Sequence, residues 1–126
     1  MELNPTATYP YQAPIDAYGN GGFRFAEMSH KGSLLCLPDG MHGWRVLEGE
    51  VLDVGHFARV LASLRPPGFL LLGTGGTQVF PSPEVRAAFA SAGLGLEIMS
   101  TGSACRTYNV LLAEHRTFAA ALIATD

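Results

Sequence analysis

Basic residues are few in this 126-residue sequence, and they form no cluster. Eight lysines and arginines stand against eleven aspartates and glutamates, which gives a net charge of -3, and the only lysine is Lys31. Proteins that bind nucleic acids or anionic membrane surfaces concentrate their positive charge in a patch. We therefore expect neither a nucleic-acid partner nor a polybasic membrane-binding segment.

Cysteine is equally scarce. Cys36 and Cys105 lie far apart and belong to no CxxC or CxxH pattern, so a disulfide framework is not indicated and a reducing compartment fits best. The first residues contain neither a basic region nor an apolar run, which predicts no signal peptide and no transit peptide. The longest apolar run, residues 69–72, is far too short to cross a bilayer. The sequence predicts a cytoplasmic protein without direct membrane insertion.

The usual catalytic arrangements are also missing. The four histidines share no metal-ligand spacing, and neither a G-x-S-x-G element nor a Ser/His/Asp set is present. Glu48 and Glu50 alternate along an expected exposed edge and are interpreted as solvated side chains. We expect no metal and no cofactor, and a binding function is favoured over an enzymatic one.

What the chain does have is apolar material, with 48% hydrophobic residues, enough to fill one core. Three early strands precede an alternation of helices and strands, and this order predicts an α/β fold. We expect a single three-layer domain with a mixed central sheet, N-terminal β-hairpins first, over residues 16–126. The expected strands cover residues 23–28 and 33–37 (paired as a hairpin), 41–47, 68–73, 96–99 and 117–124, and the expected helices cover 54–64, the stretch from Pro83 to Gly93, and the stretch after Thr101.

Residues 1–15 are expected to form an extended arm, because they contain Pro5, Pro10 and Pro14. Tyrosines of this region would attach it to the domain. Helical spacing predicts two buried stripes on the later helices. Their members are Val85, Ala88, Phe89 and Ala92 on one helix, and Ala104, Tyr108, Leu111 and His115 on the other.

Two loops are candidate ligand sites, because each follows a strand end, where open α/β sheets bind ligands. The first contains Gly73, Thr74 and Gly75, whose glycines would let an anion approach the backbone. It matches no phosphate-binding motif, so a tight structural turn is the alternative. In a parallel pair of strands both loops would lie on one rim of the sheet and share a pocket.

The second loop begins a helix with Thr101, Gly102 and Ser103, and Arg106 and Asn109 follow on its first turns. Helix N-termini bind anions through their free amides, and Arg106 would close over the ligand. The alternative is a capped helix start in which Arg106 and Asn109 hold two loops together. Cys105 is interpreted as a small buried thiol, because no base or resolving thiol can be placed beside it.

The block Ala104-Cys105-Arg106-Thr107-Tyr108-Asn109 resembles the small domain family of the mitochondrial complex I assembly factor 3. The segments 18–23, 32–40, 70–75 and 82–84 resemble it too, so the likeness covers residues 16–124. It implies a three-layer α/β fold on a mixed sheet, and no enzymatic activity is established for the family. Its mitochondrial members are assembly factors that bind partner proteins beside the inner membrane.

The resemblance leaves two hypotheses open. One is a non-enzymatic binding or assembly protein of the bacterial cytoplasm, peripheral to the inner membrane, whose partner is a protein of membrane-complex assembly or translocation. It would need an exposed apolar patch, which we expect around Trp44 or the N-terminal tyrosines. The other is a small-anion binding protein or weak enzyme that uses the rim of the two loops, with Arg106 as the anion anchor, and needs a concave polar pocket.

Overall fold

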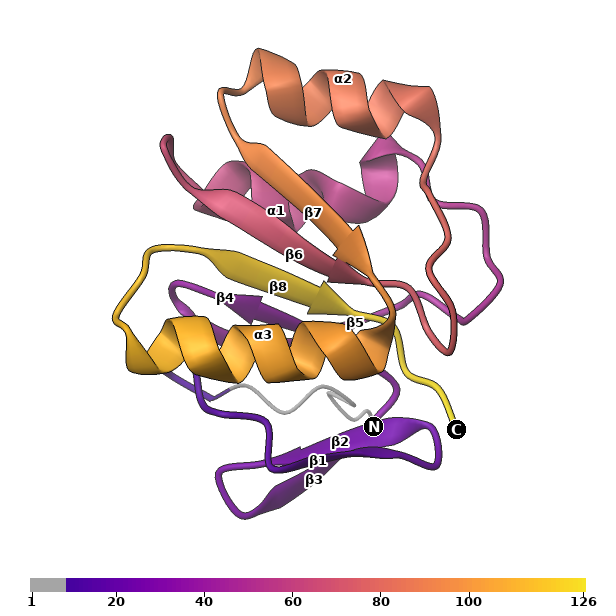
Figure 1. Ribbon diagram of the computed structural model, residues 1–126, viewed down its shortest axis with the longest axis vertical. Helices are drawn as coiled ribbons and strands as arrows, with labels where there is room; N and C mark the ends of the chain where they lie inside the picture. Colours follow the sequence, from indigo (N-terminus) through magenta and orange to yellow (C-terminus); the bar gives the residue numbers. More distant parts are fainter. Residues whose placement is uncertain (1–8) are drawn as a thin grey trace, which may run out of the picture.

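The computed structural model describes residues 9–126 and contains two β-sheets (Figure 1). The smaller sheet is antiparallel, with the order β1-β2-β3. Its strands are β1 (Ala17–Gly19), β2 (Gly22–Phe25) and β3 (Met28–Lys31). The larger sheet has the order β5-β4-β8-β6-β7. Its strands are β4 (Ser33–Leu37), β5 (Gly40–Trp44), β6 (Phe69–Gly73), β7 (Gly95–Met99) and β8 (Ala119–Leu122).

The larger sheet is mixed, as predicted. β6 runs parallel to both β7 and β8, whereas β4 runs antiparallel to β5 and β8. β8 and β6 are interior strands, paired on both sides, which explains their continuous apolar sequences. The prediction that the last strand and the 68–73 run lie inside the sheet is confirmed.

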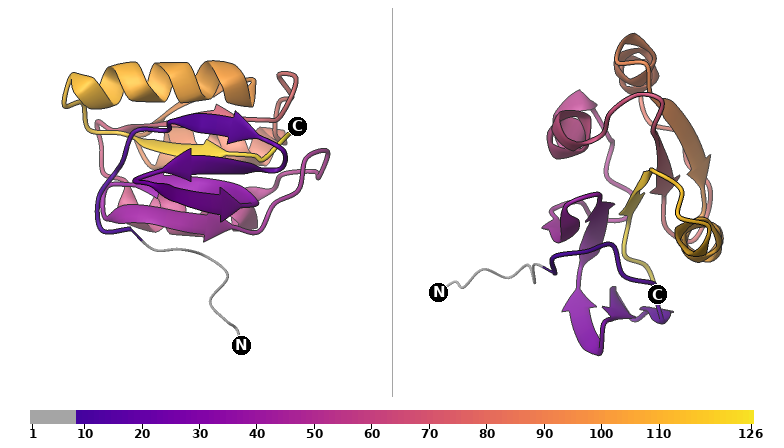
Figure 2. Two further views of the ribbon diagram at one scale, coloured as in Figure 1. Left: turned by 90° about the horizontal axis from the view of Figure 1, so that it is seen from below. Right: turned by 90° about the vertical axis from the view of Figure 1, so that its left-hand side faces the viewer.

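Helices cover both faces of this sheet, and the three-layer prediction is confirmed (Figure 2). Successive side chains of a strand point to opposite faces. Leu70 and Leu72 of β6 therefore join one apolar cluster, and Leu71 joins the other. The first cluster includes side chains of the 3-10 turn η1 (Val54–Phe57) and of the helices α1 (Ala58–Ser63) and α2 (Pro83–Ser91). The second cluster includes side chains of α3 (Thr101–Ala113) and β2.

The predicted hairpin between residues 23–28 and 33–37 is wrong. The chain turns earlier, at Ala26 and Glu27, so β2 pairs with β3 instead, and β4 belongs to the other sheet. Both turn residues have positive φ, 48° and 62°. Two-residue hairpin turns of this kind normally contain Asn-Gly. This turn contains neither glycine nor proline, so the sequence gives no signal that predicts it.

The predicted buried stripes are correct near their centres and wrong at their ends. Val85 and Phe89 are buried on α2, and Ala104 and Tyr108 are buried on α3. Ala92 is exposed because α2 ends at Ser91, and His115 is exposed because it lies beyond α3 with φ 58°. Helical spacing predicts which residues share the buried face only within the helix, because residues beyond its end no longer follow the helical repeat.

Part of the predicted N-terminal arm, residues 1–8, lies outside the described residues. The remainder packs on the domain: the backbone of Tyr9 pairs with Met41 at the edge of β5, and Gln12 donates to the Phe118 carbonyl oxygen at 2.6 Å. Ala13 and Ile15 are buried. Within residues 9–126, none of the helices combines the length and the apolar character needed to cross a membrane.

Candidate functional site

The carboxyl ends of β6 and β7 and the start of α3 meet at one rim of the larger sheet, at the right of Figure 1. The Thr101 amide donates to the Gly75 carbonyl oxygen at 2.8 Å. The Gly75 amide in turn donates to Thr101 Oγ1 at 2.8 Å, and that hydroxyl donates to the Ile123 carbonyl oxygen at 2.7 Å. The parallel pairing thus brings the two predicted loops together.

Four of the predicted site residues line a polar pocket of about 310 Å³ at this rim. They are Gly75, Gly102, Ser103 and Arg106. The pocket is completed by Gly76 and Ser100 from the same two loops and by Tyr18, Thr125 and Asp126 from two other segments. Sequence reasoning could not find Tyr18, Thr125 or Asp126, because they reach the rim only through tertiary folding.

The other four predicted residues are bonded or packed inside the fold. A side-chain carbon on Gly73 would lie 3.0 Å from Ala104 Cβ, so this glycine lets α3 approach the sheet. The Thr74 hydroxyl donates to the Thr77 carbonyl oxygen at 2.7 Å, and Thr101 is bonded as described. Asn109 accepts from the Ile15 amide at 2.8 Å and donates to the Ile15 carbonyl oxygen at 2.9 Å.

The chain's own carboxylate occupies the glycine loop. Glu48 Oε2 accepts from the Gly76 amide at 2.7 Å, and the Thr125 hydroxyl donates to Glu48 Oε1 at 2.9 Å. Gly75 has φ +98°, and a side-chain carbon there would collide with the Glu48 carboxylate. Glu48 is exposed, as expected, but it also binds the backbone amide that a ligand anion would need.

Arg106 is exposed and donates to Ser103 Oγ at 3.3 Å, while Ser100 caps α3 by accepting from the Ser103 amide. The neighbouring thiol adds no nucleophile. Burial raises the pKa of Cys105 to about 12, and Arg106 opposes this only in part. The thiol is therefore neutral at physiological pH, and the prediction of a small buried thiol is confirmed. Arg106 gives the pocket wall a cationic group.

A second feature lies beside this rim, on the loops after β5 and β6. Four large hydrophobic side chains here are strongly exposed, and we call them the apolar patch. They are Leu47 (76% exposed), Val51 (80%), Val79 (55%) and Phe80 (60%), which are four of the seven such residues in the described chain. Three of them, Val51, Val79 and Phe80, line a groove of about 140 Å³, with Leu52, Pro81 and Ile123 also in its wall.

The expected patch around Trp44 is wrong. Trp44 is only 8% exposed and packs against Phe57 in the core, with ring centroids 5.6 Å apart. Its indole N–H donates to the His56 carbonyl oxygen at 2.8 Å. Tyr11 and Tyr18 are exposed, but they lie on the N-terminal segment and on β1. The true patch could have been suspected from apolar residues that stand outside every periodic segment, such as Val51 and Phe80.

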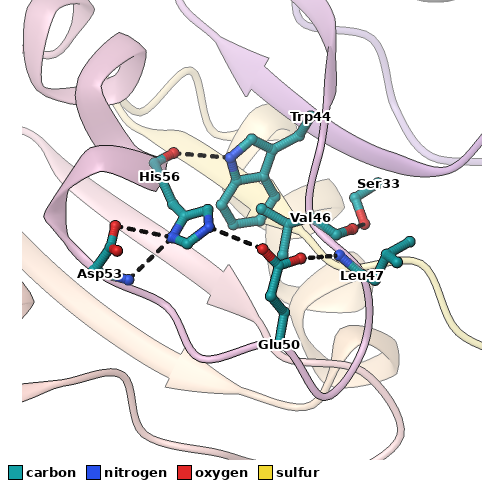
Figure 3. A network of polar contacts seen from close by, with 7 residues as sticks. All are labelled: Ser33, Trp44, Val46, Leu47, Glu50, Asp53 and His56. Atoms are coloured by element: carbon teal, nitrogen blue, oxygen red, sulfur yellow. Dashed lines mark hydrogen bonds and ion pairs between the residues drawn. The ribbon is translucent and has the colours of Figure 1, made fainter.

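A network of hydrogen bonds fixes the loop that carries Leu47 and Val51 (Figure 3). The Asp53 amide donates to His56 Nδ1 at 3.0 Å, and Asp53 Oδ1 lies 3.1 Å from the same nitrogen. His56 Nε2 lies 3.1 Å from Glu50 Oε2, and Glu50 Oε1 accepts from the Leu47 amide at 2.9 Å. The Leu47 amide, followed by His56, lowers the pKa of the Glu50 carboxyl.

Metal ligands are not gathered anywhere in residues 9–126: no group of three or more His, Cys, Asp or Glu side chains could hold an ion.

Comparison with known proteins identifies relatives of the chain. NADH dehydrogenase [ubiquinone] 1 alpha subcomplex assembly factor 3 of Mus musculus is 30% identical over 117 residues, which are 91% of this chain and 62% of the mouse protein. The chain thus spans less than two thirds of that relative. A crystal structure described as an outer membrane protein from Bartonella henselae is 45% identical, with a TM-score of 0.85 over 94% of this chain and 99% of that one.

A solution structure of a Bordetella pertussis protein, described as an Mth938-like domain, is 27% identical. It superposes with a TM-score of 0.73 over 98% of this chain and 92% of that one, so the chain has the Mth938-like fold. A family model, described as a protein of unknown function (DUF498/DUF598), matches residues 15–123, nearly the whole described structure. The chain is homologous to complex I assembly factor 3 and belongs to the DUF498/DUF598 family.

Proposed function

We propose that this chain is a non-enzymatic binding protein that takes part in the assembly of a membrane protein complex. It acts from the cytoplasm, peripheral to the membrane, and its partner is a protein of the assembly or translocation machinery. The name of the mouse relative supports an assembly role, and the description of the Bartonella protein supports a membrane association.

The apolar patch is the observation that carries this proposal. Exposed apolar side chains gathered on one surface are characteristic of sites that bind other proteins. Here they lie beside the edge of the sheet where an α/β enzyme would place its catalytic loops. The glycine loop at that edge is filled by Glu48, and the neighbouring Cys105 thiol is buried and neutral.

A deletion strain of the organism that encodes the chain tests the proposal. We expect the amount of at least one assembled membrane complex to fall on native gels, while its subunits are still synthesised. Complementation with the wild-type gene should restore the complex. Normal amounts of every respiratory and translocation complex in the deletion strain would contradict the assembly role.

A second candidate is a small-anion binding protein or weak enzyme, favoured by the polar pocket of about 310 Å³ that contains Gly75, Gly102, Ser103 and Arg106. The Glu48 carboxylate on the loop and Asp126 in the pocket wall both oppose a second negative charge. Titration of the ¹⁵N-labelled chain with inorganic phosphate decides between the two. Chemical-shift changes at residues 75–76 and 102–106 that disappear in Arg106→Ala would favour this candidate. The absence of such changes at these residues would reject it.

A further inference from the structure

The apolar patch stands in acidic surroundings. The two loops that carry it, residues 47–53 and 74–82, contain Glu48, Glu50 and Asp53 and neither lysine nor arginine, and Glu84 follows in the first turn of α2. The nearest arginines along the chain are the exposed Arg45, just before the first loop, and Arg86, whose guanidinium carbon lies 5.4 Å from the centre of the Phe80 ring. Asp53 is exposed, with 71% of its side chain accessible. A partner that covers the patch therefore meets negative charge at its border.

The groove within the patch has the size of one side chain. Its volume of about 140 Å³ is close to that of the engineered lysozyme cavity of roughly 150 Å³ that binds benzene. Leu52, Pro81 and Ile123 give it an apolar wall. The wall also contains Ser82, whose hydroxyl is buried and has no hydrogen-bond partner in the described structure. Buried polar atoms are nearly always paired, and an apolar side chain cannot pair with this hydroxyl, so its partner would have to be a backbone group of the segment that enters the groove.

The loop at the groove is already ordered. Glu50 is held by the Leu47 amide and by His56 (Figure 3). Glu48 is held by Gly76 and Thr125. Binding to a fixed surface loses less conformational entropy than binding that must first order a loop. The same contacts keep the Glu48 and Glu50 carboxylates at the border of the patch.

A second copy of the chain is a poor occupant. In a symmetric dimer the same patch faces itself, so the acidic border of one copy would meet the acidic border of the other. Like charges brought together across an interface are unfavourable. A partner with positive charge beside an apolar side chain has no such conflict.

We propose that the apolar patch binds a partner segment that inserts one aromatic or branched apolar side chain into the groove and sets flanking lysines or arginines against the carboxylates of the two loops. This inference rests on the proposed function, because it assigns the chemistry of the protein partner. The insertion supplies affinity through burial of apolar area, and the flanking charges supply selection against acidic or neutral segments.

Three synthetic peptides test the proposal by chemical-shift titration of the ¹⁵N-labelled full chain. The first has a central Phe-Leu pair flanked by lysines, the second replaces the lysines by glutamates, and the third replaces Phe-Leu by Gly-Ser. We expect shifts confined to residues 47–53 and 74–82 with the first peptide. Its Kd should be at least about tenfold lower than that of either control peptide, and it should rise with added salt, because salt screens exposed charges.

Matched variants locate the binding surface. The double variant Val51→Asn/Val79→Asn should weaken binding of the first peptide at least about tenfold. Val110→Asn is the control, because Val110 is as exposed as Val79 (58% against 55%) but lies on α3. All of these side chains point into solvent, so the variants are expected to fold, and circular dichroism checks this.

The proposal would be overturned if the lysine and glutamate peptides bound with equal affinity, or if the shifts fell outside residues 47–53 and 74–82. It would also be overturned if the double variant bound the first peptide as tightly as the wild type does. So would a dimer of the chain alone, seen by light scattering and abolished by the double variant. These outcomes are separable from failure of the proposed function. The titration does not depend on any complex in the cell, and the deletion strain does not depend on which segment binds.

Discussion

Tyr108 shows how single side chains join the N-terminal segment to the domain. It is fully buried on α3, and its hydroxyl donates to the Ala13 carbonyl oxygen at 2.8 Å. Tyr108→Phe leaves that carbonyl without its donor, so we expect the free energy of unfolding to fall by about 1–2 kcal/mol in urea. Tyr11→Phe is the control, because Tyr11 is 65% exposed and its change should have no measurable effect. Equal stabilities of both variants would refute the role assigned to the Tyr108 hydroxyl.

The buried thiols predict a particular dependence on pH. Burial raises the pKa of Cys105 to about 12 from its ordinary 9.0, and burial also raises the pKa of Cys36. Below pH 9 the Cys105 thiol is protonated in both the folded and the unfolded chain. Above it only the unfolded chain ionises, so stability is lost as the pH rises toward 12, by at most about 1.4 kcal/mol per pH unit for this thiol.

Urea unfolding at several alkaline pH values measures this loss. We expect a shallower decline above pH 9 for Cys105→Ala than for the wild type, with parallel curves below it. A thiol reagent at pH 8 should label the native chain only as fast as it unfolds. Rapid labelling of Cys105 in the native chain would instead indicate an accessible thiolate.

At the scale of elements, the turn between β2 and β3 contains residues that are poorly suited to its backbone conformation and lower the stability of the fold. Ala26 and Glu27 hold positive φ values, which cost residues other than glycine and asparagine about 1 kcal/mol each. Replacing them by Asn-Gly should raise the free energy of unfolding by about 1 kcal/mol. Glu27→Gln keeps the strain and should leave stability unchanged. A destabilised Asn-Gly variant would contradict the positive φ values of this turn.

The same turn shows why some elements were predictable and others were not. Pro83 at the start of α2 and the apolar run of β6 are local signals, and the structure contains both elements. β3 was missed because its turn has no glycine or proline, and β1 was missed because its three residues give no alternation to detect. The shared rim was predictable because parallel strands end at the same edge, whereas Tyr18 and Asp126 come to it only through the folded chain.

At the scale of the whole molecule, the family and the three-layer fold could be inferred from sequence, but the binding surface could not. Exposure of an apolar residue in a loop depends on what the rest of the chain leaves uncovered. Trp44 is covered by η1 and lies in the core, while Phe80 is left 60% exposed. The structure therefore moves the expected apolar patch from the tryptophan to the loops after β5 and β6.

Exchange of the chromosomal gene for the patch variant tests whether the chain acts by binding a partner at the apolar patch. Assembled membrane complexes are quantified on native gels in strains carrying Val51→Asn/Val79→Asn, Val110→Asn, or a deletion, with the amount of the chain checked by immunoblot. We predict that the patch variant loses the complex as the deletion does, while Val110→Asn retains it. Normal assembly in the patch variant, in an organism whose deletion strain loses the complex, would contradict this prediction.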